Sequence, residues 1–76
     1  MNNQRRLLIE KAKKQISEIE NLIEKVLDDE QDAYDNLPEG IRMSEKGEKM
    51  EDAISSLENA SDKIAELIEC LDEAAG

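Results

Sequence analysis

Apolar residues recur at steps of three and four along both halves of the chain, the spacing of one face of an α-helix. In the first half the steps alternate regularly, which assigns these residues to the a and d positions of a heptad repeat. The first seam consists of Ile9, Ala12, Ile16, Ile19, Ile23, Val26, Glu30 and Ala33. This pattern predicts a helix over about residues 3–35.

A second seam with the same alternation occupies the other half of the chain. It consists of Met43, Gly47, Met50, Ile54, Leu57, Ser61, Ile64, Ile68, Leu71 and Ala75. The pattern predicts a second helix over about residues 44–74. Ser44 is the expected N-cap, and Glu45 and Glu48 fall in the first turn, where exposed N–H groups and the helix dipole favour negative charge.

A short segment with helix-breaking residues separates the two predicted helices. Pro38 disfavours helical backbone at Leu37, the residue before it. Gly40 permits a positive φ, and Asn36 tolerates a turn conformation. We therefore expect the first helix to end here and the chain to reverse.

The two seams match when the chain is folded about residue 40, so that the numbers of facing residues sum to 80. Ile9 then faces Leu71, and near the turn Ala33 faces Gly47, where two small residues would let the backbones approach closely. The same register places basic residues of the first helix (Arg5, Arg6, Lys11, Lys13 and Lys14) beside acidic residues of the second (Glu66, Glu69, Asp72 and Glu73). The sequence thus predicts an all-α fold, one antiparallel two-helix hairpin over residues 1–76.

One flank of this hairpin stays apolar after both seams are used. This apolar flank consists of apolar residues at g positions of both helices: Leu8, Leu22, Ala53, Ala60, Leu67 and Ala74. A lone pair of helices is marginal against its conformational entropy, so we expect the flank to be covered. Two hairpins closing into a homodimeric four-helix bundle is the favoured interpretation. Docking of the flank on a different protein and a partly molten monomer are the alternatives.

The charge balance limits the partners that the chain can bind. Its 76 residues include 20 acidic and 10 basic residues, a net charge of −10. Repulsion makes direct binding to nucleic acid or to an anionic membrane surface unfavourable. No apolar run approaches the roughly 20 residues that cross a bilayer. Cys70 is the single cysteine and cannot form an internal disulfide, which predicts a cytoplasmic location.

Acidic residues gather around the predicted turn. This acidic surface includes Asp28, Asp29, Asp32, Asp35, Glu45 and Glu48. An inhibitor or nucleic-acid mimic would use such carboxylates to occupy a basic groove on a target protein. This function is the alternative to a dimeric interaction module.

The segment from Asp28 to Glu39 has acidic residues at positions 1, 3, 5 and 12, which is the spacing of a calcium-binding loop. Position 6 is Ala33 where such a loop needs Gly, and the heptad pattern continues through it. We therefore interpret the segment as a solvated acidic helix end.

The chain has no His, no nucleophile-and-base set and no Gly-rich phosphate loop, and Cys70 is expected to be an incidental surface thiol. We predict a protein that is not an enzyme and uses no cofactor or metal.

The turn Tyr34-Asp35-Asn36-Leu37-Pro38-Glu39, followed by Ser44-Glu45, resembles a turn in small acidic helical proteins of bacterial mobile elements and phages. Those proteins share a Tyr-x-Asn-x-Pro-Glu turn and a Ser-Glu helix restart, and the resemblance covers residues 30–57. It implies a bacterial or phage origin and a helical hairpin, and it transfers no catalytic or binding residue. The function predicted from the sequence is a noncatalytic protein–protein interaction module.

Overall fold

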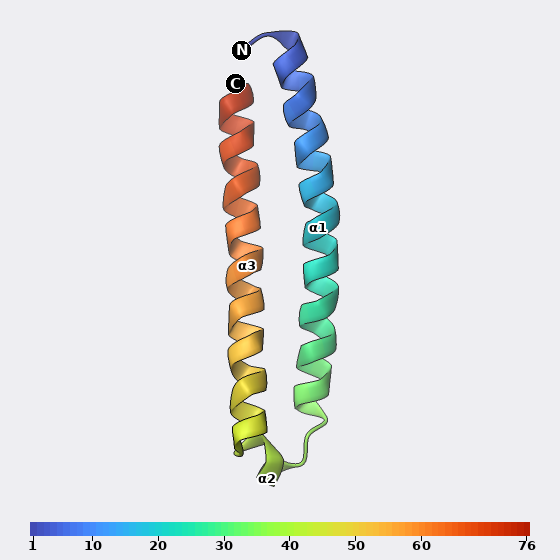
Figure 1. Cartoon of the computed structure of the whole chain (residues 1–76), viewed down its shortest axis with the longest axis vertical. Coiled ribbons are helices and arrows are strands. Elements are labelled where there is room, and N and C mark those ends of the chain that lie inside the picture. The colour runs from blue at the N-terminus through green and yellow to red at the C-terminus, as the bar shows by residue number, and fades with distance from the viewer.

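The computed structural model describes all 76 residues as two long antiparallel helices with a short helix between them (Figure 1). Helix α1 spans Asn3–Asp35, α2 spans Glu39–Arg42 and α3 spans Glu45–Ala75, and there is no strand. The all-α class and the antiparallel hairpin are therefore confirmed, with each long helix within one residue of its predicted bounds. The fold nevertheless has three helices, because α2 occupies the segment that the sequence assigned to a turn.

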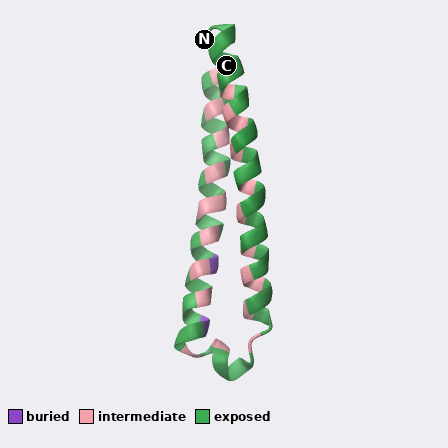
Figure 2. Ribbon diagram, turned by 45° about the vertical axis from the view of Figure 1, so that its right-hand side comes forward, coloured by how far each residue is buried: buried purple, intermediate pink, exposed green.

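The hairpin is a thin rod with both termini at one end and α2 at the other (Figure 1). Its dimensions are 58 × 15 × 12 Å, and its radius of gyration is 17.3 Å, against roughly 11 Å for a compact domain of this length. A single layer of side chains separates the helices. Only Gly47 and Ile54, both in α3, are buried, and most seam residues are half-buried (Figure 2).

The ends of the long helices follow the expected capping with one difference. Asn2 caps α1, because its Oδ1 accepts a 2.9 Å hydrogen bond from the Arg5 N–H. Ser44 is the N-cap residue of α3 by position and backbone conformation, but its side chain caps no N–H group. Its hydroxyl donates instead to the Ile41 carbonyl. The prediction of Ser44 as the N-cap residue is therefore confirmed, but its side chain bonds to the Ile41 carbonyl because the turn of α2 brings this carbonyl within reach.

The break between the helices lies at Pro38, as predicted, but it does not use a glycine with positive φ. Pro38 has φ −57° and ψ 145° and stands at the N-cap of α2. The N–H groups of Ile41 and Arg42 donate to its carbonyl at 2.9 and 3.0 Å. Gly40 therefore lies inside a helical turn, and the only positive φ in the chain belongs to Gly76.

Three contacts between α1 and α3 confirm the predicted register. The Lys13 ammonium pairs with the Asp72 carboxylate, and the Tyr34 hydroxyl donates to Glu51. The residue numbers add to 85 in both pairs. Residues of the seam face each other with a sum of 80, and this register gives a sum of 85 for the flanking residues that directly follow a d position on each helix. Near the open end, the Arg6 side chain donates to the Ala75 carbonyl at 3.1 Å. Of the predicted charge pairs, only Lys13 with Asp72 forms an interhelical ion pair.

Helix α1 is rotated about its axis relative to the predicted seam. Ile19 and Val26, which were assigned to the seam, are 50% and 51% exposed, and Ala33 is also exposed. The residues one position further along the chain are half-buried in their place: Glu20, Leu27 and Tyr34. The reason is that the larger Leu27 and Tyr34 bury more surface against α3 than Val26 and Ala33 would.

The seam of α3 lies where it was predicted, except at its beginning. Residues from Gly47 to Ala75 that were assigned to the seam are buried or half-buried. Met43 is 81% exposed and lies between α2 and α3. It does not belong to the seam, because the chain has not yet entered α3 at that point.

Candidate functional site

The structure leaves much of the predicted apolar flank open to solvent. Leu8, Leu22 and Leu67 are 61%, 65% and 46% exposed. Ala53 and Ala60 are half-buried beside α1, and Ala74 is exposed. The three leucines are therefore available for contact with another molecule, while the two alanines contribute a smaller area.

The rotation of α1 adds residues to this surface that the sequence pattern had placed between the helices. Ile19 lies three residues before Leu22, and Val26 lies four residues after it. Leu8 lies 18 residues before Val26, which is five helical turns, so all four lie on one side of α1. We call the set Leu8, Ile19, Leu22, Val26 and Leu67 the apolar face. The sequence pattern placed Ile19 and Val26 in the seam, because an a/d assignment does not determine how far the helix is rotated about its axis. The presence of Leu27 and Tyr34 one residue further along was the available signal.

The opposite flank of the hairpin is polar and connects α1 with α3. The hydrogen bond and ion pair to Asp72 raise the pKa of the Lys13 ammonium, with a smaller contribution from Glu10. The Tyr34 hydroxyl donates to Glu51 on the same flank, closer to the turn. These contacts hold the two helices side by side.

The Arg42 side chain connects α2 with the end of α1. Its guanidinium donates a 2.8 Å hydrogen bond to the carbonyl of Asp35, one of the unpaired carbonyls at the C-terminus of α1. The same group lies 5.7 Å from the centre of the Tyr34 ring, a cation–π distance. Its Nε is buried and has no hydrogen-bond partner. The distinctive turn residues are thus used to hold the hairpin together.

Gly47 has a structural role that differs from the predicted one. A Cβ built on Gly47 would lie 2.7 Å from the Arg42 Cα and closer still to the Arg42 carbonyl. The close approach is therefore to the backbone of Arg42, the last residue of α2, whereas Ala33, the predicted neighbour, is exposed. Glycine is required here because any side chain would push α2 away from α3.

The pKa of the Tyr34 phenol reports on its hydrogen bond to Glu51 near the turn. The hydrogen bond to Glu51 raises the pKa of the phenol above its ordinary value of about 10, with further contributions from burial. Because the pKa of Tyr34 is higher in the folded chain than in the unfolded chain, the protonated phenol stabilises the fold. This stabilisation is complete at a pH below the pKa of the unfolded chain, and it is lost as the pH rises through the pKa of the folded chain. Tyr34 is the only aromatic residue, so phenolate absorbance reports on it alone.

We expect Glu51→Gln to lower the absorbance midpoint of Tyr34, because it removes the carboxylate that favours the protonated phenol. Glu48→Gln is the matched control, since Glu48 lies on α3 and forms no bond with Tyr34. Equal midpoints in the two variants would contradict the assignment of the shift to Glu51.

The acidic surface is fully accessible around the turn. All six of its residues are exposed. Asp29 pairs with Lys25 at 3.6 Å, Glu45 pairs with Lys49 at 3.3 Å, and the Asp35 carboxylate accepts a 3.0 Å hydrogen bond from Gln31. Its residues before the turn lie within α1, and nowhere in the chain do three metal-ligating side chains come together.

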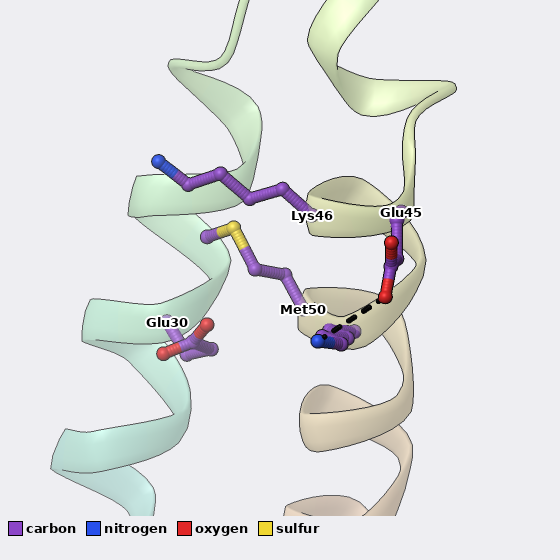
Figure 3. Close-up of a pocket in the computed structure, with 5 residues that line it drawn as sticks. Glu30, Glu45, Lys46 and Met50 are labelled. Atoms are coloured by element: carbon purple, nitrogen blue, oxygen red, sulfur yellow. Dashed lines mark ion pairs between the residues drawn. The ribbon is translucent and has the colours of Figure 1, made fainter.

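A shallow, open depression lies between α1 and α3 near the turn (Figure 3). Its lining residues are Glu30, Glu45, Lys46, Lys49 and Met50. Figure 3 shows Lys46 and Met50 extending from α3 toward α1, with Glu30 on the facing helix. Glu30 and Met50 are thus neighbours, as the register predicted. The depression combines two carboxylates with two ammonium groups, which is a mixed-charge surface without a nucleophile.

Cys70 is exposed and its thiol is free. Neither long helix contains a stretch apolar enough to cross a membrane. No family model, curated protein or solved structure matches the chain. The resemblance of the turn to proteins of mobile elements and phages therefore stays a prediction.

Proposed function

We propose that this protein is a noncatalytic interaction module that works as a homodimer, in which the apolar faces of two hairpins pack together. The observation that carries the proposal is the exposure of the apolar face along one side of the rod. Ile54 is the only buried apolar residue, whereas the five residues of the face are 46% to 65% exposed. A row of large apolar side chains thus remains open to solvent on one side of the hairpin.

The total exposed area supports a partner for this surface. The hairpin exposes 5746 Å², whereas a folded monomer of its 8.6 kDa mass exposes roughly 4,700 Å². The excess of roughly 1,000 Å² is comparable with the approximately 800 Å² that each partner contributes to a standard interface. Packing of a second copy would give the chain the buried fraction that one hairpin lacks.

Sedimentation equilibrium over a range of concentrations tests this proposal. We expect a molecular mass twice the 8.6 kDa of the chain, with dissociation on dilution. The melting temperature should rise with concentration, because a dimer that unfolds to monomers is stabilised by mass action. A folded chain that stays monomeric at high concentration would contradict the proposal.

A second candidate function is the occupation of a basic groove on another protein by the acidic surface. It is favoured by the exposure of all six carboxylates and by the net charge of −10. Binding of this kind weakens strongly with salt and with neutralisation of Asp28, Asp32, Glu45 and Glu48. Binding through the apolar face depends little on salt, so salt dependence separates the two functions.

The free thiol of Cys70 fits a reducing compartment, and we propose that the protein acts in the cytoplasm.

A further inference from the structure

The direction in which two hairpins pair follows from how charge is distributed along the rod. The half near the turn, residues 21–59, holds 12 acidic and 4 basic residues, a net charge of −8. The open half, residues 1–20 and 60–76, holds 8 acidic and 6 basic residues, a net charge of −2. The rod is therefore strongly acidic at one end and nearly balanced at the other.

Helix α1 has the steepest contrast, and it carries four of the five residues of the apolar face. Its N-terminal part has more basic than acidic residues: Arg5, Arg6, Lys11, Lys13 and Lys14 against Glu10, Glu18 and Glu20. Its C-terminal part has one basic residue against six acidic ones: Lys25 against Glu24, Asp28, Asp29, Glu30, Asp32 and Asp35. The two parts are complementary to each other and not to themselves.

We infer that the second copy lies antiparallel on the apolar face, so that α1 of one hairpin runs along α1 of the other in the opposite direction. This inference rests on the homodimer proposed above. A twofold axis perpendicular to the rod then places the basic part of each α1 beside the acidic part of its partner, and symmetry makes the contact twice. The parallel alternative would bring together two ends of charge −8, and repulsion of like charge selects against that orientation.

The apolar face fits this symmetry. Its central members, Ile19 and Leu22, lie at the middle of α1, which spans Asn3–Asp35. A twofold axis crossing α1 near these two residues preserves overlap of the helices over their whole length. The two turns, with α2 and the acidic surface, then lie at opposite ends of the dimer.

Pulsed electron spin resonance on spin-labelled dimers tests the orientation. The labels are placed by Gln4→Cys or by Asn21→Cys in a Cys70→Ser background, and positions 4, 21 and 70 are exposed. In an antiparallel dimer the two labels at position 4 should lie about 50 Å apart, because they are separated by most of the length of α1. In a parallel dimer they would lie within about 20 Å of each other, at the same end of the rod.

The label at position 21 separates failure of the orientation from failure of the dimer. It lies near the middle of α1, so it should give a short distance in either orientation. A short distance at position 21 with a long one at position 4 supports the antiparallel dimer. Short distances at both positions would overturn the orientation and keep the dimer, and the absence of a dipolar signal at both would refute the dimer itself.

Discussion

Gly47→Ala is expected to lower the free energy of unfolding by about 1–3 kcal/mol, the usual effect of forcing extra atoms into a packed site. Alanine is the better helix former by about 1 kcal/mol, so intrinsic propensity alone would predict the opposite sign. The clash decides, because a Cβ at this position meets the backbone of Arg42 and not the movable end of a side chain. The whole of α2 would have to shift. Denaturant unfolding followed by far-ultraviolet circular dichroism, at one fixed protein concentration, measures the change.

Gly40→Ala is the matched control for this prediction. Gly40 also lies in a helix, but a Cβ there would have no atom within 4 Å. We expect an unchanged or higher stability, by at most about 1 kcal/mol, because only helix propensity and the entropy of the unfolded chain change. If both variants lost stability equally, the contact with Arg42 would not be the reason for glycine at position 47.

Leu22→Glu is expected to dissociate the proposed dimer. Leu22 is 65% exposed in the single hairpin, and a fully exposed Leu gains about 1.5–3 kcal/mol on burial. Each dimer contains the residue twice, so the substitution should cost about 2–4 kcal/mol per dimer, roughly a 30- to 700-fold increase in Kd. A carboxylate in the interface adds a desolvation penalty to this loss. Sedimentation equilibrium of the variant against the unmodified chain measures the increase.

Leu7→Glu is the control that separates the apolar face from general surface charge. Leu7 is 70% exposed, and it precedes Leu8 by one residue, so it lies about 100° away around α1. The two variants have the same net charge and the same type of change. An equal loss of dimer in both would show that charge, and not the apolar face, controls association.

The sequence predicted the buried seam of α3 correctly and that of α1 only in part, and this difference has a physical cause. In α3 the seam residues are the large ones, such as Ile54 and Leu57, and few apolar residues compete on either side. In α1 the d positions near the turn are Val26 and Ala33, which are smaller than their neighbours Leu27 and Tyr34. Two rotations of α1 were therefore compatible with the same pattern, and the pattern alone could not choose between them.

The candidate site was predicted in the same uneven way. Leu8, Leu22 and Leu67 were identified from the sequence as an apolar flank and are exposed in the structure. Ile19 and Val26 were placed between the helices and are half-exposed, which moves the centre of the apolar surface onto α1. The role of Gly47 was also misassigned, because its close contact is with the residue that ends α2 and α2 itself was not expected.

The sequence by itself determined the helix bounds, the break at Pro38 and the register between α1 and α3, because periodicity, capping residues and proline act locally and each has one favoured outcome. The tertiary structure decided the rotation of α1, the formation of α2 and the close packing at Gly47. These depend on which side chains from different helices bury the most surface together. Energies of that kind are small differences between nearly equal packings, and they become definite only when all the contacts form at once.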